Sequence, residues 1–370
     1  MNILVTGAGG FIGKNLVQRL RFMDGYSVFS FDIDTDPSLL ATYAKDADAV
    51  FHLAGINRPK KSEEFMEGNF GFTKTLLDTL ESVGNTRATI AVSSSIQAAL
   101  DNEYGASKKA GEELVRQYSQ RTGAHSVIYR FPNVFGKWCR PNYNSAVATF
   151  CHNIARGLPI TVNDPETLLH LVYIDDVVDE LLACLSHKEH VRDGYGYVPC
   201  VYDVKLGLIP RLLHSFKESR ESLYLPDLSD GFEKKLYSTY LSYLEEDDFS
   251  YKLCPHKDNR GSFTEFVRSS DRGQVSVNIS NPGIVKGNHW HNTKNEKFLV
   301  VKGEGVIRFR KIGTDSVKEY RVSGDDPTVV DIPCGYTHNI INVGEGEMIT
   351  VMWANEAFDP DNPDTYYEEV

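Results

Sequence analysis

Apolar residues in the first 240 positions form short continuous stretches, separated by segments with helical spacing. Between the first two stretches, Leu16, Val17 and Leu20 share one face of a helix predicted over 14–23. Continuous apolar strands that alternate with helices are typical of a parallel, doubly wound α/β sheet covered on both faces. The predicted strands span residues 2–6, 26–32, 49–53, 88–93 and 125–131.

The periodicity changes after two further amphipathic patterns, which predict helices over 206–216 and 232–244. From residue 251, apolar and polar residues alternate in short segments bounded by Gly, Asn and Asp, a pattern that predicts an all-β barrel or sandwich. We therefore expect two domains, at 1–246 and 251–370. The predicted strands of the second domain span residues 274–279, 297–301, 305–310, 328–332 and 348–353.

Composition narrows the possible partners. The chain has 370 residues and a formal net charge of -12, and a nucleic-acid binder needs a basic face. No apolar run approaches the roughly 20 residues of a membrane span, and the N-terminus reads as a strand rather than a signal peptide. The six cysteines form no Cys-x-x-Cys pair and are predicted to be free thiols. We expect a cytoplasmic protein that binds neither nucleic acid nor membrane.

A glycine-rich turn, TGAGGFIG at 6–13, joins the first predicted strand to the first helix. Glycines at such a turn let backbone N–H groups approach a pyrophosphate at the helix N-terminus, so we expect dinucleotide binding rather than a purely structural turn. Asp32 ends the second strand, where a carboxylate can accept from the ribose of NAD or remain a solvated strand-end acid. The turn residues expected to contact the cofactor are Gly7, Gly10, Phe11, Ile12 and Gly13.

A tyrosine and a lysine with i, i+4 spacing, Tyr104 and Lys108, share one face of the helix predicted to run to Thr122. A nearby ammonium favours the phenolate, so we expect Lys108 to lower the pKa of Tyr104. Tyr104 could then donate a proton to a carbonyl oxygen during hydride addition. The serines at 93–95 end a strand and can supply a hydroxyl to the same oxygen.

These features resemble the extended short-chain dehydrogenase/reductases, which have a Rossmann-type fold. The resemblance implies a catalytic trio of Ser95, Tyr104 and Lys108, with Ser94 as the alternative serine. It also implies cofactor contacts from Tyr104, Lys108 and the turn at Ala54 and Gly55, and nucleotide-sugar binding by Asn133. The motifs that carry the resemblance are TGAGGFIG at 6–13, HLAG at 52–55, YGASK at 104–108, RFPNVFG at 130–136 and YIDDVV at 173–178.

Three histidines and a glutamate in the second domain suggest a metal site. His289 and His291 are two residues apart, so on a strand both would point to one face. Glu296 and His338 can complete the set from neighbouring strands. Three imidazoles and one carboxylate suit a divalent transition metal, above all zinc, with a position left for water or substrate. The alternative, which would be favoured for an isolated His-x-His, is that the two strand histidines are ordinary core or surface residues with hydrogen-bond partners.

The same residues resemble the cupin fold, a jelly-roll barrel. The first cupin motif spans Gly283 to Gly303, and the second spans Pro333 to Asn342. The stretch HKDNRGSFTEF at 256–266 is similar to the nucleotide-sugar 3,5-epimerase branch of cupins. That resemblance implies that Arg260 holds the diphosphate and that Glu265 lies near the base.

The whole chain resembles a family of bifunctional capsular-polysaccharide enzymes that fuse a reductase to a cupin. The resemblance implies C3 epimerisation of a UDP-2-acetamido-2,6-dideoxy-4-hexulose by the cupin domain. The reductase domain would then reduce the C4 ketone to the L-talose sugar, in the UDP-N-acetyl-L-fucosamine pathway. A homodimer and NADPH are also implied, whereas Asp32 favours NADH.

Three other functions stay open at this stage. The cupin could be only a dimerisation and stability module of a monofunctional reductase, the chain could sense dinucleotide and metal without turnover, or the cupin could be a metal-dependent oxygenase. The proton-abstracting base is also open. His289 aligns with the catalytic histidine of non-metal epimerases, yet here it is a predicted metal ligand.

Overall fold

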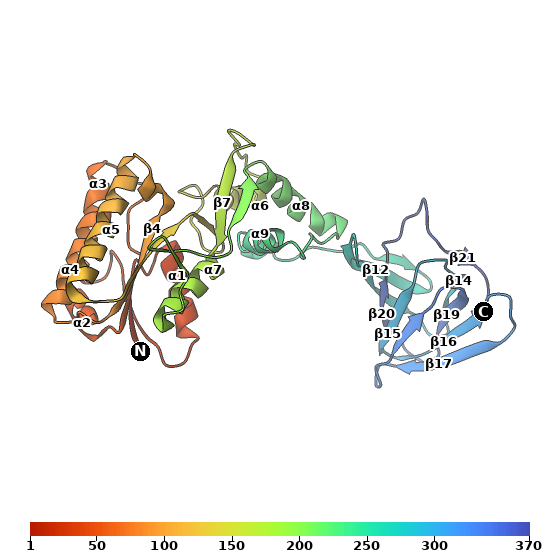
Figure 1. The fold of residues 1–370 in the computed structure, drawn as a ribbon. Coiled ribbons are helices and arrows are strands. Elements are labelled where there is room, and N and C mark those ends of the chain that lie inside the picture. Colours follow the sequence, from red (N-terminus) through yellow and green to blue (C-terminus); the bar gives the residue numbers. More distant parts are fainter. The chain divides into compact units, whose positions relative to one another are not determined.

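The computed structural model describes residues 1–370, which form two compact units (Figure 1). Unit 1 comprises Met1–His214 and Gly231–Glu245, and unit 2 comprises Ser215–Asp230 and Glu246–Val370.

The segment 215–230 belongs to unit 2, whereas the sequence-based boundaries placed it in the first domain. Backbone hydrogen bonds account for the difference. The N–H of Leu225 donates to the carbonyl of Arg268 at 2.8 Å, and the N–H of Arg268 donates to the carbonyl of Leu223 at 2.7 Å. The chain thus adds a short extended stretch to unit 2 before it returns to unit 1.

A seven-stranded sheet forms the centre of unit 1, in the order β2-β1-β3-β4-β5-β9-β8. Every pairing in it is parallel except that of β8 with β9. The first five strands agree with the predicted apolar stretches to within two residues at either end. The strands are β1 (Asn2–Thr6), β2 (Ser27–Phe31), β3 (Ala49–His52), β4 (Thr89–Ser95), β5 (Ser126–Phe131), β8 (Val191–Arg192) and β9 (Tyr195–Gly196).

Helices cover both faces of this sheet because its strands alternate their side chains. Ile3 and Val5 of β1 pack in the cluster that contains residues of α1 and α7, whereas Leu4 packs in the cluster with residues of α4 and α5. The helices are α1 (Phe11–Arg21), α2 (Leu39–Asp46), α3 (Glu63–Phe65), the π-helix η1 (Met66–Gly71), α4 (Phe72–Ser82), η2 (Ile96–Ala99), α5 (Glu103–Thr122), α6 (Ala146–Ala155), α7 (Ile174–Ala183) and η3 (Cys184–Ser186).

A second, three-stranded sheet in the order β10-β7-β6 lies in the same unit. Its strand β6 begins at Asn133, directly after β5 and Pro132, so this residue lies at the end of the large sheet. The two helices predicted late in the domain are present as α8 and α9. The elements are β6 (Asn133–Phe135), β7 (Leu168–Tyr173), β10 (Tyr202–Lys205) and α9 (Gly231–Leu241). The helix α8 (Leu208–Ser222) begins in unit 1 and ends in unit 2, and η4 (Glu246–Asp248) belongs to unit 2.

Unit 2 contains two antiparallel sheets, ordered β11-β12-β13-β20-β15-β18 and β17-β16-β19-β14-β21. Phe298 of the first sheet and Phe309 and Ile340 of the second share one buried cluster, so the sheets enclose a common core. The strands are β11 (His256–Asp258), β12 (Gly261–Ser269), β13 (Gly273–Ser280), β14 (Val285–Trp290), β15 (Glu296–Lys302), β16 (Glu304–Lys311), β17 (Val317–Ser323), β18 (Val329–Ile332), β19 (Tyr336–Asn342), β20 (Met348–Ala354) and β21 (Tyr366–Tyr367). The predicted fold class, a doubly wound α/β domain followed by an all-β cupin, is confirmed.

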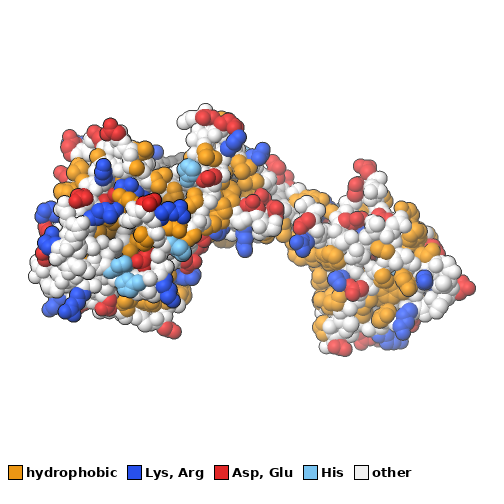
Figure 2. Space-filling model, in the orientation of Figure 1, with side chains coloured by type: hydrophobic (Ala, Val, Ile, Leu, Met, Phe, Trp, Pro, Cys, Tyr) orange, Lys and Arg blue, Asp and Glu red, His pale blue; other side chains and the backbone are white.

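Acidic and basic side chains are interspersed over the visible face of each unit (Figure 2). All six cysteines are free, as predicted. None of the helices combines the length and the apolar character needed to span a bilayer.

Candidate functional site

The glycine turn between β1 and α1 is too tight for side chains at two of its positions. Gly7 has a φ of +69°, and a Cβ there would lie 2.6 Å from the backbone nitrogen of Ala54. A Cβ at Gly13 would lie 2.1 Å from the carbonyl oxygen of Gly7. The turn therefore packs against the loop that follows β3. It brings the N-terminus of α1, with its free backbone N–H groups, to the carboxyl edge of the sheet.

Asp32 supports this turn from the end of β2. One of its carboxylate oxygens accepts from the N–H of Gly9 at 2.5 Å, and the other accepts from the N–H of Ile33 at 2.8 Å. The carboxylate is thus held beside the glycine turn, at the strand end where a ribose lies in Rossmann-type folds. The ribose contact itself stays a prediction.

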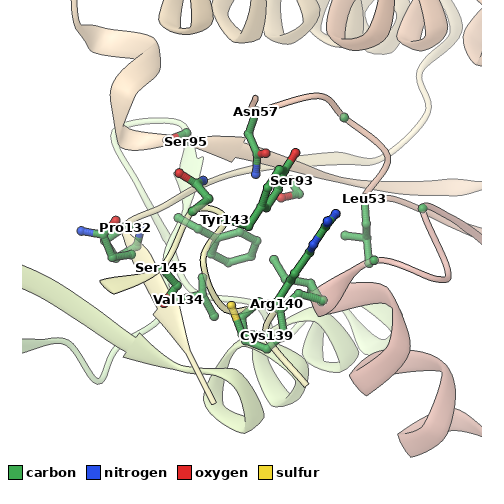
Figure 3. A pocket seen from close by; sticks show the side chains of 18 of the residues that line it. Leu53, Asn57, Ser93, Ser95, Pro132, Val134, Cys139, Arg140, Tyr143 and Ser145 are labelled. Atoms are coloured by element: carbon green, nitrogen blue, oxygen red, sulfur yellow. The ribbon is translucent and has the colours of Figure 1, made fainter. Parts of the chain in front are cut away.

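A cleft of about 600 Å³ opens at the carboxyl edge of the sheet. Figure 3 shows side chains from several loops gathered around this space. Asp32 and Ala54 lie outside the cleft lining. The predicted residues that line it are Gly7, Gly10, Phe11, Ile12, Gly13, Gly55, Ser94, Ser95, Tyr104, Lys108 and Asn133.

The two candidate serines point to different partners. Buried Ser94 donates to the Glu112 carboxylate at 2.5 Å, and Glu112 also pairs with Arg130 at 2.6 Å. Ser95 instead accepts from the N–H of Gln97 at 3.2 Å, and its hydrogen-bonding influence lowers the pKa of Tyr104. Ser94 is therefore part of a buried polar network, and Ser95 is the serine that affects the tyrosine.

Desolvation raises the pKa of Tyr104, and the hydrogen bond with Ser95 opposes this rise. The expectation that Lys108 lowers this pKa was wrong, because the Lys108 ammonium donates to the carbonyl of Ser93 at 3.1 Å. Desolvation lowers the pKa of Lys108 itself to about 8, against the opposing charge of Glu112. Tyr104 therefore stays protonated at neutral pH, as a proton donor must.

Two arginines near the cleft were missed by the sequence reasoning. The Arg140 and Arg58 guanidinium carbons lie 5.1 Å and 5.9 Å from the ring centroid of Tyr143. Arg140 and Tyr143 line the cleft, and neither guanidinium pairs with a carboxylate in the structure. No motif marks these residues, because their charge becomes informative only once the fold gathers them around Tyr143 in the cleft wall. They offer positive charge to an anionic ligand.

The four predicted metal ligands of unit 2 converge. Their donor atoms all lie within 4.8 Å of one another. His289 lies on β14 opposite His338 of β19, and Glu296 begins β15. His291 lies just beyond the end of β14. The two histidines are therefore oriented by a bulge at Gly287–His289 and by the loop that follows, and not by the alternation of a regular strand.

The charges of the cluster suit a cation. Desolvation raises the pKa of Glu296, but contacts with His291 and His338 outweigh it and hold the pKa well below its usual range. Desolvation lowers the pKa of His289 to about 4, so this imidazole is neutral at physiological pH. The pKa of His291 is raised, because its contacts with Glu296 and Asp364 outweigh desolvation.

The donor atoms fit a bound metal. The Nε2 atoms of His291 and His338 and one Glu296 oxygen are buried and form no hydrogen bond. The Nδ1 of His291 donates to the Asp364 carbonyl at 2.6 Å, which leaves its Nε2 lone pair for a ligand role. Three nitrogens and one carboxylate oxygen are a donor set for zinc or a related divalent metal.

The cluster lies in the wall of a cavity of about 650 Å³. Arg260 also lines it, but its guanidinium is paired with Asp258 at 2.6 Å. Glu265, predicted to lie near the base, does not line the cavity and accepts a hydrogen bond from Arg268 instead. Lys286 and Lys294, which sequence reasoning did not single out, add two cations to the lining.

Comparison with known proteins agrees with this two-part architecture. Residues 3–198 match the NAD dependent epimerase/dehydratase family, and residues 256–366 match the polysaccharide biosynthesis C-terminal domain. The chain is 44% identical over 366 residues to the UDP-2-acetamido-2,6-beta-L-arabino-hexul-4-ose reductase of Pseudomonas aeruginosa, across 99% of this chain and 98% of that protein.

Solved structures show the same relationship. The capsular polysaccharide assembling protein CapF from Staphylococcus aureus matches with a TM-score of 0.95 and 53% identity, over 100% of both chains. The UDP-glucuronic acid 4-epimerase from Bacillus cereus in complex with NAD matches 66% of this chain and 96% of its own, with a TM-score of 0.55 and 21% identity, which shows a shared fold. The chain belongs to the NAD dependent epimerase/dehydratase family, and its full-length similarity to CapF confirms the family resemblance expected from the sequence.

Proposed function

We propose that this protein is a bifunctional nucleotide-sugar enzyme of surface-polysaccharide biosynthesis. Unit 2 epimerises C3 of UDP-2-acetamido-2,6-dideoxy-4-hexulose, and unit 1 reduces the C4 ketone of the product to the L-talose sugar. The name of the Pseudomonas reductase supports this substrate class, and the name of CapF supports a role in surface-polysaccharide biosynthesis. The observation that carries the proposal is that Ser95, Tyr104 and Lys108 line the same cleft as the glycine turn.

In the reductase step, the chain's own residues manage the proton and the developing charge. The bound nicotinamide supplies the hydride to C4. Tyr104 donates its proton to the C4 oxygen, and Ser95 holds the same oxygen by a hydrogen bond. The Lys108 ammonium, 3.1 Å from the Ser93 carbonyl, supplies positive charge beside the cofactor ribose.

The cofactor is NADH or NADPH. Asp32 favours NADH, because a carboxylate at this position accepts from the ribose hydroxyls and repels an added phosphate. Arg58 and Arg140, which lie near the ring of Tyr143, offer positive charge to the substrate diphosphate. A homodimer and a cytoplasmic location remain part of the proposal.

In the epimerase step, the C4 ketone acidifies the C3 proton, and reprotonation from the opposite face inverts the centre. A divalent cation held by His289, His291, Glu296 and His338 would stabilise negative charge that develops on oxygen. The cluster opens on a cavity that also holds Arg260, which favours a catalytic role, since purely structural zinc sites are closed. Arg260 would bind the diphosphate.

Hydrogen exchange at C3 tests the two activities separately. The zinc-loaded protein is incubated with the 4-keto UDP-sugar in deuterated water without nicotinamide, and then NADH or NADPH is added. We expect deuterium at C3 in the first stage and oxidation of the cofactor in the second.

Two variants assign the activities to the two units. Tyr104→Phe should reduce cofactor oxidation by about 100-fold or more and leave C3 exchange intact. Glu296→Gln should lose C3 exchange and should still oxidise the cofactor when the C3-epimerised 4-keto sugar is supplied. Absence of exchange in the zinc-loaded wild type, with reduction preserved, would instead make this a monofunctional reductase with a structural cupin. Oxygen uptake would point to an oxygenase. Undiminished cofactor oxidation in Tyr104→Phe would exclude Tyr104 as the proton donor.

A further inference from the structure

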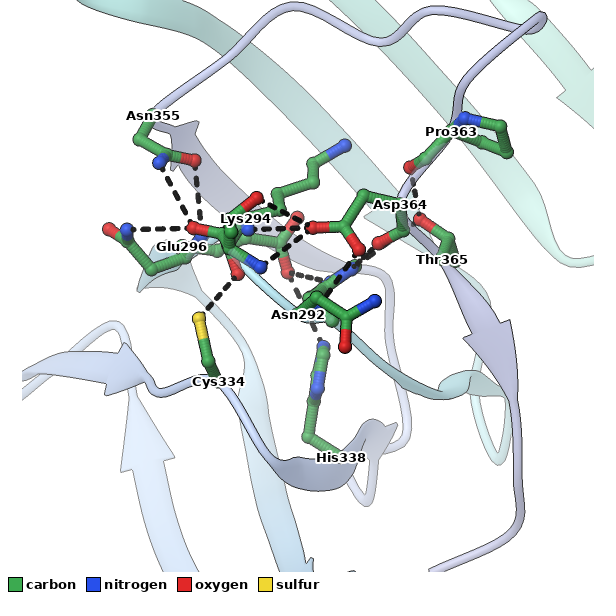
Figure 4. A network of polar contacts seen from close by, with 12 residues as sticks. Asn292, Lys294, Glu296, Cys334, His338, Asn355, Pro363, Asp364 and Thr365 are labelled. Carbon is green, nitrogen blue, oxygen red and sulfur yellow. Dashed lines mark hydrogen bonds and ion pairs between the residues drawn. The ribbon is translucent and has the colours of Figure 1, made fainter.

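The carboxylate of Asp364 binds the backbone of the loop that joins two metal-site residues, His291 and Glu296. The side chain of Asp364 accepts from three successive backbone N–H groups, those of Asn292, Thr293 and Lys294, at 3.0, 2.8 and 2.9 Å. It also accepts from the Thr293 hydroxyl at 3.1 Å. These bonds, drawn in Figure 4, fix the loop between His291 and Glu296.

The same residue contacts a metal ligand directly. The backbone carbonyl of Asp364 accepts from Nδ1 of His291 at 2.6 Å, although the two residues are 73 positions apart. This bond sets the tautomer of His291 and turns its Nε2 toward Glu296, 3.6 Å away. One residue thus holds both the loop backbone and the orientation of the imidazole.

The chain around Asp364 is anchored independently of the loop. Tyr366 and Tyr367 form β21, which pairs with Trp290 and His289 of β14. The rings of Trp290 and Tyr366 stack with centroids 4.8 Å apart. Because β21 pairs with β14, the strand that carries His289, the position of Asp364 relative to the loop is fixed.

We propose that Asp364 is a positioning residue for the metal site, which holds His291 and the loop before Glu296 in the geometry that binds the ion. This inference rests on the proposed metal site. Its physical basis is preorganisation. A carboxylate over successive N–H groups pins a loop that would otherwise lose conformational freedom when the metal binds, and outer contacts of this kind typically contribute 10–100-fold to metal affinity.

Zinc affinity of the full-length protein tests the proposal, measured by competition with a chromogenic chelator at fixed pH. We expect Asp364→Ala to bind Zn²⁺ about 10–100-fold more weakly than wild type. Asp364→Asn keeps an acceptor oxygen without the charge and should lie between the two. Asp361→Ala removes an exposed acid of the same segment whose carboxylate forms no hydrogen bond, and should leave the affinity unchanged.

Two further readouts separate positioning from a general effect on folding. The absorption band of the Co²⁺-loaded protein reports ligand geometry and should change in Asp364→Ala but not in Asp361→Ala. The rise in melting temperature on adding Zn²⁺ should shrink in Asp364→Ala, while the metal-free melting temperatures stay close.

Unchanged zinc affinity and an unchanged Co²⁺ band in both Asp364 variants would overturn the inference, as would a melting temperature lowered equally with and without metal. A wild-type protein that binds neither ion would overturn the metal site itself. That result is distinct, because it appears before any variant is compared.

Discussion

At the scale of single residues, removal from water decides the protonation of the groups in the reductase cleft. Desolvation raises the pKa of Tyr104 and lowers that of Lys108 to about 8. A tyrosine that holds its proton more tightly remains a donor over the whole physiological range. A lysine with a depressed pKa loses its charge within reach of ordinary buffers, so Lys108 is the group whose titration should be visible.

The reductase rate should therefore fall as pH rises through about 8, where Lys108 becomes neutral. Tyr104 does not contribute to this fall, since its pKa lies above the usual value. Lys108→Arg keeps its charge at every accessible pH and should shift the falling limb to higher pH, whatever its effect on the maximal rate. Initial rates of cofactor oxidation between pH 6 and 10 measure this.

Lys109 is an exposed neighbour on the same helix, so Lys109→Arg is the matched control. It should leave the pH profile of the reductase rate unchanged. An identical falling limb in wild type and Lys108→Arg would assign that limb to another group.

At the scale of elements, the β1–α1 turn brings a helix N-terminus within reach of a cofactor only because two backbones approach closely. Gly13 packs against the carbonyl of Gly7, and Gly7 packs against the backbone of Ala54. The whole turn is thus a contact between α1, β1 and the loop after β3. A methyl group added in this contact could be accommodated only by a shift of the backbone, because no flexible side chain is there to move. Such a shift costs folding free energy.

Gly13→Ala should weaken dinucleotide binding at least tenfold and lower the melting temperature, because its Cβ would lie 2.1 Å from the Gly7 carbonyl oxygen. A loss of about 1.4 kcal/mol in binding free energy corresponds to that tenfold change. Fluorescence titration with NADH and NADPH measures the affinity.

The control is Gly71→Ala, where φ is -60° and the nearest atom would lie 3.7 Å from the added Cβ. This substitution should leave cofactor affinity intact and leave stability equal or slightly increased. Equal affinity in wild type and Gly13→Ala would show that the turn can open without cost to the cofactor.

At the scale of the whole molecule, unit 2 draws residues from two separate parts of the chain. The segment 215–230 joins it through the backbone bonds of Leu223 and Leu225 with Arg268. The Arg268 guanidinium also lies 5.8 Å from the ring centroid of Tyr224. We therefore expect the cupin to fold together with the segment 215–230, which precedes the predicted boundary at 251.

A fragment of residues 215–370 should accordingly melt at a higher temperature than a fragment of residues 251–370. The shorter fragment lacks the two backbone bonds to Arg268, each worth about 0.5–1.5 kcal/mol, and the contact of Arg220 with Asp248 at 2.8 Å. Thermal denaturation of both fragments at equal zinc concentration measures the difference. Equal melting temperatures would show that the 215–230 segment packs on the cupin without stabilising it.

Much of the fold could be predicted from the sequence, and so could most of the residues that the structure brings together at the two candidate sites. The first strand was predicted with its full bounds, because a continuous apolar stretch between turns has few other stable environments. The four metal-site residues were predicted by residue type and spacing, and their donor atoms do converge. The exceptions were the direction of the Tyr104 pKa shift, the assignment of the segment 215–230 to unit 2, and three residues outside the cavity linings, Asp32, Ala54 and Glu265. All of these depend on which neighbours each segment or side chain meets.

The sequence by itself determined the two fold types and the two sets of reactive residues, since periodicity and short motifs act over a few neighbouring positions. Only the tertiary structure decided that Ser94 is held by Glu112 while Ser95 affects the pKa of Tyr104, and that Asp364 holds His291 from 73 positions away. The physical reason is that these choices depend on desolvation and on hydrogen bonds between distant segments. Such contacts exist only after the sheets have packed.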